Sequence, residues 1–239
     1  MYYSNITSLT IGVLLVNNGI QMTDVASVDV LTMVGKDYMT LLPNNPGANA
    51  IASLASPMSV VYITENGTTP IALTGGAEID ANYTIEDAPK LDILVVPGPA
   101  LDYVPDEKVR SFIKSTNDDG GHILSVCTGI LAVAPSGVLD GKNGTALLGI
   151  VPEMRELWPK VEWKDTRRWE RNAAEGTKGQ VWSSGSIANG IDQAAAFVRE
   201  HWPAEIAEPM MYLASVPERP AEYSEEEKEW GDKWTAILS

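Results

Sequence analysis

Three short, mainly apolar runs mark the chain, and each is followed by a segment of helical periodicity. The runs are Ile11–Val16, Leu91–Val96 and His122–Val126, and each has the length and composition of a strand buried on both faces. The segments with helical spacing are 24–36, 105–115, 128–134, part of 147–158, 187–201 and 203–213. Strands that alternate with helices predict an α/β fold with a mostly parallel sheet and helices on both faces.

Shorter β-rich segments complete the pattern. Met58–Thr64 and Pro70–Thr74 are separated by Asn66-Gly67, and this arrangement predicts a β-hairpin. A turn is expected at Asn17-Asn18-Gly19, where the first apolar run ends. Further short strands are expected at 161–163, 169–171 and 180–183.

No internal repeat or low-complexity linker interrupts the chain, so we expect a single α/β domain over residues 1–216. Residues 217–239 differ, because they open with two prolines and continue as EEEKEWGDKW. This composition predicts an acidic arm or surface helix. Trp230 and Trp234 share one face of such a helix, since they are four residues apart. We expect that face to dock on the body of the same chain, with a second subunit as the alternative.

Charge and cysteine content restrict the partners and the compartment. The chain of 239 residues has 17 basic and 32 acidic side chains, a formal charge of −15. Such a surface repels phosphate backbones and anionic lipids, so neither nucleic-acid nor membrane partners are expected. A single cysteine cannot form an internal disulfide, and no signal-peptide pattern is found at the N-terminus. We therefore expect a soluble, cytoplasmic protein. No phosphate-binding loop or Cys/His cluster occurs, so no cofactor and no metal are expected.

The lone cysteine, Cys127, stands where the third apolar run gives way to small residues. A tight strand-to-helix turn there lifts its side chain above the carboxyl edge of the sheet, where α/β proteins keep their sites. The N–H groups of the following helix favour a thiolate and offer donors for an oxyanion. The alternative is a small buried hydrophobic side chain, as free cysteines often are.

Three stretches together resemble the ThiJ/PfpI superfamily, whose fold is shared with class I glutamine amidotransferases. They are SVCTGILAVAPSGVLDGKNGTA, the Pro97-Gly98 pair one strand earlier, and VWSSGSIANGIDQAAAFV. The resemblance runs from about Ile11 to Tyr212 and implies a flavodoxin-like, doubly wound sheet with a nucleophile elbow. Members with Cys-Thr at the elbow, as here, are closest to isocyanide hydratases and to uncharacterised fungal proteins. The superfamily also implies a homodimer.

The resemblance implies roles for several residues. Cys127 matches the nucleophile of the superfamily, and an acid after the first strand lies close to its sulfur. Asp24 matches this acid if one residue is inserted in the turn, whereas Thr23 falls there without a gap. The other reading of Asp24 is a helix N-cap. Backbone N–H groups for an oxyanion are expected from Thr128, Gly129 and Gly98.

Two departures narrow the chemistry. The chain has two histidines, His122 and His201, and neither matches the catalytic histidine of the superfamily. A Cys–His hydrolase needs an imidazole to carry protons, so peptidase and amidotransferase activities are disfavoured, and glyoxalase activity is weakened. Pro99 stands where many members have a glycine whose N–H serves the oxyanion site. Trp169 and Ser184 match loops that border the cleft, or else pack the structure.

These observations together predict a cofactor-free hydratase or lyase that acts on a small electrophilic molecule. The concrete version converts an isocyanide into an N-formamide, with Cys127 as nucleophile and a protonated Asp24 as proton donor. Three alternatives stay open. They are a lyase or cyclase of secondary metabolism that uses Asp24 as acid and base, a redox sensor that oxidises Cys127, and a binding protein without chemistry.

Overall fold

A computed structural model describes residue 3, residues 8–16 and residues 19–238 of the chain. Its main sheet has seven strands in the order β10-β11-β7-β6-β1-β2-β5. All neighbours in it are parallel except β10 and β11. This architecture confirms the predicted doubly wound, mostly parallel α/β fold. The strands are β1 Leu9–Leu15, β2 Met58–Thr64, β5 Tyr83–Thr84, β6 Ile93–Val96, β7 His122–Ser125, β10 Trp169–Asn172 and β11 Val181–Ser184.

The three predicted buried strands form the centre of this sheet. β1 pairs with β2 on one side and with β6 on the other, and β6 pairs with β7. Every residue of β6 is buried, and so are six of the seven residues of β1. A strand covered on both faces does not alternate polar with apolar residues, which is why these runs are mainly apolar. Asn17 and Asn18 of the predicted turn after β1 lie outside the described residues.

The hairpin predicted between Met58–Thr64 and Pro70–Thr74 is wrong. Gly67 does turn the chain, with a φ of +80°. However, both edges of β2 are already occupied, by β1 and by β5, so no edge is free for a returning strand. The chain instead forms a separate two-stranded sheet, which consists of β3 (Ile71–Ala72) and β4 (Glu78–Ile79).

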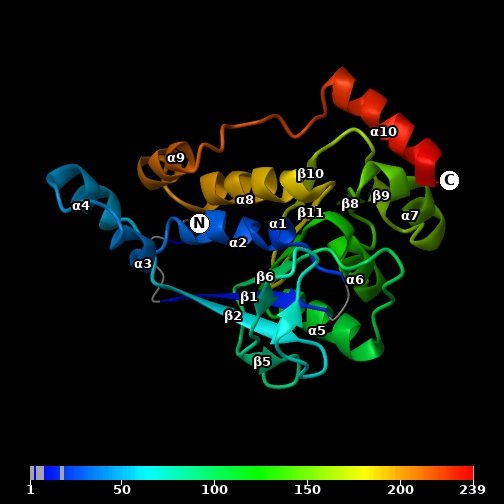
Figure 1. Cartoon of the computed structure of the whole chain (residues 1–239), viewed down its shortest axis with the longest axis horizontal. Helices are drawn as coiled ribbons and strands as arrows, with labels where there is room; N and C mark the ends of the chain where they lie inside the picture. The colour runs from blue at the N-terminus through cyan, green and yellow to red at the C-terminus, as the bar shows by residue number, and fades with distance from the viewer. Residues whose placement is uncertain (1–2, 4–7, 17–18, 239) are drawn as a thin grey trace.

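Helices cover both faces of the main sheet (Figure 1). The connections β1→β2 and β6→β7 run in opposite directions from the centre, so right-handed crossovers place their helices on opposite faces. One face carries α1 (Met22–Val25), α2 (Ser27–Thr32) and α8 (Ile187–His201), which pack together. The other face carries α5 (Glu107–Asp118) and α6 (Ile130–Val133). The segment predicted as one helix over 24–36 forms two short helices instead, α1, which begins at Met22, and α2, which ends at Thr32.

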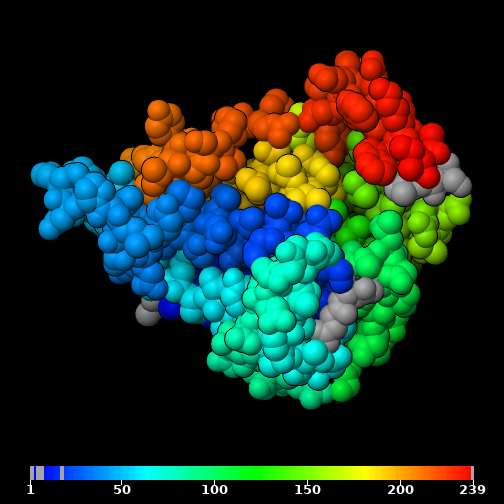
Figure 2. All heavy atoms as spheres, in the orientation of Figure 1, coloured from blue at the N-terminus to red at the C-terminus, as the bar shows by residue number. Residues whose placement is uncertain are grey.

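The remaining helices lie at the rim of the molecule. α3 (Lys36–Met39) leads into α4 (Pro46–Ala52), which has no buried residue and projects from one end (Figures 1 and 2). α7 (Val151–Leu157) and a two-stranded sheet of β8 (Asn143–Gly144) and β9 (Glu162–Trp163) lie at the other end. No described helix combines the length and the apolarity that a membrane crossing needs.

The C-terminal segment forms a helix, α10 (Glu225–Leu238), that docks on its own chain. It approaches the turn at Leu148–Ile150 so closely that a Cβ on Gly231 would lie 2.4 Å from Leu148 Cδ1. Trp230 and Trp234, in contrast, remain 57% and 49% exposed. The expected docking therefore occurs, but it is made by the glycine side of the helix. The boundary predicted after residue 216 stays a prediction.

Candidate active site

Cys127 occupies a sharp elbow between β7 and α6. Its φ is +55°, a left-handed conformation that only Ser215 shares among the described residues other than glycine. The elbow turns over the end of β6, where a Cβ on Gly129 would lie 2.0 Å from the Val96 carbonyl oxygen. Only glycine fits there, so the sequence Cys127-Thr128-Gly129 permits this turn, and the predicted tight strand-to-helix turn is confirmed.

Hydrogen-bond donors from two helical turns face the Cys127 sulfur. They are the N–H and hydroxyl of Thr128 and the N–H of Ile187, the first residue of α8. The Thr128 hydroxyl also donates to the Pro99 carbonyl at 2.6 Å, so its single proton cannot serve both acceptors at once. Sequence reasoning missed Ile187. The signal was available, because a strand was predicted over 180–183 and a helix from residue 187, and parallel strands end at one sheet edge.

The expectation of a preformed thiolate is wrong. The sulfur is buried, and burial together with the negative charge of Asp24 raises the pKa of Cys127 to about 11. The N–H donors of Thr128 and Ile187 lower the pKa but do not outweigh desolvation. At neutral pH the free protein therefore holds a thiol, and a base is needed to generate the nucleophile.

Asp24 is the acid that the structure places beside the elbow. It lies in α1 and is 1% exposed, whereas Thr23 and Asp29 are exposed. The Gly98 N–H donates to its carboxylate, and Oδ1 has no hydrogen-bond partner among the described residues. A Cβ on Gly98 would lie 3.0 Å from Asp24 Oδ2 and 2.4 Å from Thr128 Oγ1. Gly98 thus faces both the carboxyl and the Thr128 side chain, and a larger side chain at this position would collide with them. Asp24 is not an N-cap, since Gln21 takes that position.

Burial also changes the acidity of this carboxyl. Desolvation raises the pKa of Asp24 to about 7, although the Gly98 N–H stabilises the ionised form. A carboxyl with such a pKa exchanges protons readily at neutral pH, as a general acid or base requires. Asp24 and Cys127 therefore form a pair in which the carboxyl loses its proton before the thiol does.

The three N–H groups predicted to bind an oxyanion donate to three different acceptors in the structure. The Thr128 N–H faces the sulfur, as described above. The Gly98 N–H is bonded to Asp24, and the Gly129 N–H donates to the Val126 carbonyl at 2.8 Å. Gly129 is therefore needed for the turn, and its N–H is not free for a substrate. The Ile187 N–H is the further donor at this site.

The predicted pocket residues also differ from one another in their structural roles. Pro99 is buried and its carbonyl anchors Thr128. Ser184 is fully buried and donates to the Ser125 carbonyl at 3.1 Å, which ties β11 to β7. Trp169 stacks on Trp182, with ring centroids 5.4 Å apart. Ser184 and Trp169 thus pack the sheet beside the elbow, while Pro99 orders the elbow itself.

Comparison with known proteins decides the family. Residues 30–200 match the model described as the DJ-1/PfpI family. The chain belongs to the DJ-1/PfpI family. Isonitrile hydratase of Pseudomonas putida is 29% identical over 157 residues, which are 64% of this chain and 63% of that protein. The chain therefore spans less than two thirds of this curated relative.

Solved structures show the same fold. A ThiJ/PfpI family protein from Pseudomonas syringae superposes with a TM-score of 0.67 at 15% identity, covering 97% of this chain and 91% of that one. Drosophila melanogaster DJ-1beta gives a TM-score of 0.65 at 17% identity, covering 88% of this chain and 99% of that one. Asp24 and α10 both lie outside the residues that match the DJ-1/PfpI model.

In this DJ-1/PfpI chain both histidines lie at the opposite edge of the sheet from Cys127. Their ring centroids are 5.0 Å apart, and they pack with Phe197. His122 begins β7, so five strand-like residues, or about 16 Å, separate it from Cys127. Burial lowers the pKa of His122 to about 4 and that of His201 to about 3. Neither imidazole can exchange a proton with the sulfur.

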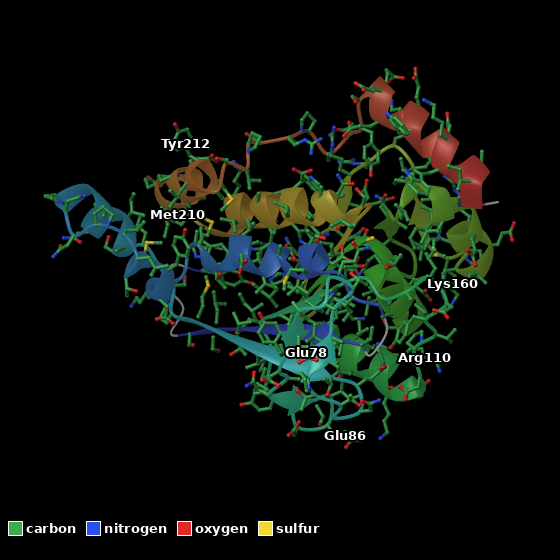
Figure 3. The ribbon with its side chains drawn as sticks, in the orientation of Figure 1. Glu78, Glu86, Arg110, Lys160, Met210 and Tyr212 are labelled. Atoms are coloured by element: carbon green, nitrogen blue, oxygen red, sulfur yellow. The ribbon has the colours of Figure 1, made fainter. Side chains whose placement is uncertain are left out.

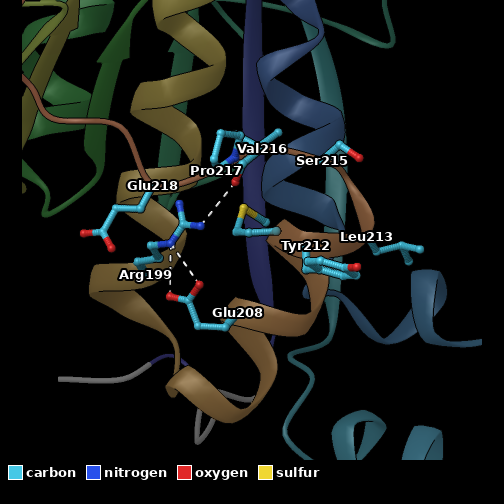
Figure 4. Close-up of a pocket in the computed structure, with 9 residues that line it drawn as sticks. Arg199, Glu208, Tyr212, Leu213, Ser215, Val216, Pro217 and Glu218 are labelled. Atoms are coloured by element: carbon cyan, nitrogen blue, oxygen red, sulfur yellow. Dashed lines mark hydrogen bonds and ion pairs between the residues drawn. The ribbon is translucent and has the colours of Figure 1, made fainter.

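One cavity of this DJ-1/PfpI chain lies apart from the elbow. A cavity of about 650 Å³ adjoins α9 (Ala204–Leu213), where Arg199 Nε donates to Glu208 at 3.0 Å (Figure 4). Within the described ranges, no three His, Cys, Asp or Glu side chains converge as metal ligands would. The acid–thiol pair is thus the feature with the clearest chemistry.

Proposed function

We propose that this chain is an isocyanide hydratase that works with Cys127 and Asp24 and converts an isocyanide into an N-formamide. The observation that carries the proposal is the buried Asp24 carboxyl, which has a pKa of about 7 and acts electrostatically on the Cys127 thiol. Such a pair supplies both a nucleophile and a proton carrier without a histidine. The similarity to an isonitrile hydratase supports the same assignment.

The first half of the reaction forms a covalent bond to sulfur. The Asp24 carboxylate takes the thiol proton while Cys127 Sγ bonds to the terminal carbon of the isocyanide. That carbon then takes the proton from the Asp24 carboxyl. The product is a thioimidate, R–N=CH–S–Cys127, and the Asp24 carboxylate is restored. The Thr128 and Ile187 N–H groups stabilise the thiolate character that develops on sulfur.

The second half consumes water. The Asp24 carboxylate takes a proton from a water molecule whose oxygen adds to the thioimidate carbon, and the proton passes to the nitrogen. The C–S bond then breaks and its electron pair returns to sulfur. Asp24 carries the hydroxyl proton to that sulfur, so the N-formamide leaves and the thiol is restored. One water molecule is added in total.

Two substitutions test the proposal. Cys127→Ser is expected to abolish hydration of cyclohexyl isocyanide, and Asp24→Asn to lower kcat/KM by about 100-fold or more. Asp29→Asn, an exposed acid on the neighbouring helix, is the matched control and is expected to keep wild-type activity. Full activity in Cys127→Ser would exclude covalent catalysis by this residue.

The pH dependence gives an independent test. The reactive form needs the Asp24 carboxylate, so protonation below its pKa of about 7 removes the base. We expect kcat/KM to be level above that pH and to fall about tenfold per pH unit below it. Rates measured between pH 5 and 9 check this. A profile that is level down to pH 5.5 would contradict the role of Asp24.

A second candidate is a lyase or cyclase of secondary metabolism in which Asp24 is the main acid–base group. The protonated state of the thiol favours it, because a neutral Cys127 is then only a neighbour of the substrate. Retained activity in Cys127→Ser, together with its loss in Asp24→Asn, would identify this case. A redox-sensing role is disfavoured, because oxidation requires a thiol of low pKa.

We also propose a cytoplasmic homodimer whose partners are small molecules, with no nucleic-acid or membrane partner. Apolar side chains that are left uncovered support the dimer. Tyr212 on α9 is 88% exposed, and Figure 3 shows its ring pointing away from the body of the molecule. A light-scattering mass near twice 25.8 kDa is expected. A mass near 25.8 kDa would refute the dimer.

A further inference from the structure

A cavity of about 340 Å³ lies between α10 and the N-terminal turn of α8. Two of its lining residues, Ser186 and Ala188, flank Ile187, whose N–H donates to the Cys127 sulfur. The two chain neighbours of Ile187 therefore line the cavity, whereas Ile187 and Cys127 themselves do not. We call it the α10 pocket.

The walls of the α10 pocket are mainly apolar. Leu147 and Leu148 line it together with Trp230 and Trp234 of α10. Both tryptophans are about half exposed, so much of their aromatic surface is open to solvent or a ligand, although Lys233 Nζ lies 4.6 Å from the centroid of the Trp230 ring. Gly231 lies between them and allows α10 to close on Leu148. A glycine inside a helix lowers the stability of that helix. The close approach to Leu148 explains why a glycine is nevertheless present at this position.

The charged groups of the α10 pocket neutralise one another. Arg219 is bonded to Asp192 at 2.9 Å and to Glu227 at 3.0 Å, and Glu227 is also bonded to Arg168. The amide oxygen of Asn189 accepts from the Tyr223 hydroxyl at 2.8 Å. Because these groups already have partners, the pocket offers little to an ion. Its chemistry suits an uncharged, apolar ligand.

We propose that the α10 pocket holds the hydrocarbon group of the substrate, and that this group is a bulky, uncharged ring. This inference rests on the proposed isocyanide hydration. The ring packs against Trp230 and Trp234 while the isocyanide carbon extends past the α8 N-terminus to Cys127. The family match ends at residue 200, so the aromatic wall comes from a segment outside it. The C-terminal helix is thus a specificity element.

The test compares benzyl isocyanide with methyl isocyanide. The ratio of kcat/KM for benzyl over methyl is expected to fall about tenfold in Trp234→Ala and to be largely kept in Trp234→Phe. Leu147→Ala, which changes a lining residue outside α10, is also expected to lower the ratio. Leu157→Ala, a similarly exposed apolar residue outside the pocket, is the control and keeps the wild-type ratio.

A binding measurement separates the pocket from the reaction. N-benzylformamide, the product, is expected to bind the wild-type chain in calorimetry and to bind Trp234→Ala at least about tenfold more weakly. If the wild type hydrates neither isocyanide, the proposed function fails, and this binding then decides on the pocket alone. If hydration persists and the ratio is unchanged in Trp234→Ala and Leu147→Ala, the pocket proposal fails. Conversion of a dimer to a monomer by Trp234→Ala would show that a second copy covers this face, and would also overturn it.

Discussion

At the scale of residues, Cys127 and Asp24 both hold their protons more tightly than they would in water. Desolvation is the main cause for each, and the negative charge of Asp24 adds to it at Cys127. The helix N–H groups near the sulfur therefore do not create a thiolate in the free protein. They stabilise one only when Asp24 takes the proton, so the pair acts as a unit.

This coupling predicts the alkylation behaviour of Cys127. Iodoacetamide is expected to react slowly at pH 7, with a rate that rises to an inflection above the free-thiol value of about 8.5. Asp24→Asn removes the nearby negative charge, so the inflection is expected to move to lower pH. Asp29→Asn serves as the control with an unchanged inflection. An inflection well below 8.5 in the wild type would show that the donors outweigh burial.

At the scale of elements, the elbow depends on the contact between the β7–α6 turn and the end of β6. The Gly129 N–H closes the turn on the Val126 carbonyl, and its missing side chain lets Val96 approach. The left-handed backbone of Cys127 is held in place by these contacts. The position of the sulfur is thus set by packing between two neighbouring strands.

Gly129→Ala is expected to disrupt this element. A Cβ at that position meets backbone atoms, so the turn must open, at an expected cost of about 1–3 kcal/mol in the free energy of unfolding. Gly75→Ala is the control, because a Cβ there meets nothing within 4 Å. Urea denaturation of both variants measures the difference. Equal stability of Gly129→Ala and Gly75→Ala would mean that the elbow is less crowded than the contact with Val96 indicates.

At the scale of the whole molecule, the two ends of the parallel strands differ in what they carry. The carboxyl edge carries the acid–thiol pair, and the amino edge carries the buried histidines. The His122 Nδ1 accepts from the Gln180 N–H at 3.0 Å, which requires a neutral ring. His201 Nε2 lies 2.8 Å from the Gln180 side-chain oxygen. These contacts join α8, β7 and β11 across the core.

The histidines predict acid lability. Burial lowers their pKa to about 4 and about 3, while the unfolded chain takes up protons near pH 6.5. The contribution of the two neutral histidines to the free energy of unfolding is therefore fully present above pH 6.5, and it is lost as the pH falls below that value. A double variant, His122→Gln with His201→Gln, is expected to lose less stability than the wild type between pH 7 and pH 5. Urea denaturation at both values measures this. An equal loss in both proteins would assign the acid sensitivity to other groups.

Local patterns were sufficient for some elements and misleading for others. The range Met58–Thr64 was predicted to the residue, because β-branched residues bounded by turn signals are a local property. The hairpin predicted between it and Pro70–Thr74 was wrong, because the neighbours of a strand are decided by the packing of the whole sheet. Here β1 and β5 occupy the two edges of β2. The helix over 24–36 was similarly recognised but not its division at Ala26.

The sequence by itself determined the succession of strands and helices along the chain, the tight turn at Cys127 and the identity of the lone nucleophile candidate. These follow from short-range periodicity and from the need for glycine beside Cys127. Only the tertiary structure decided that Asp24 rather than Thr23 faces the elbow, that Ile187 contacts the sulfur, and that the thiol stays protonated. Those properties depend on burial and on the proximity of segments far apart in the chain, and neither quantity is a property of a local stretch of residues.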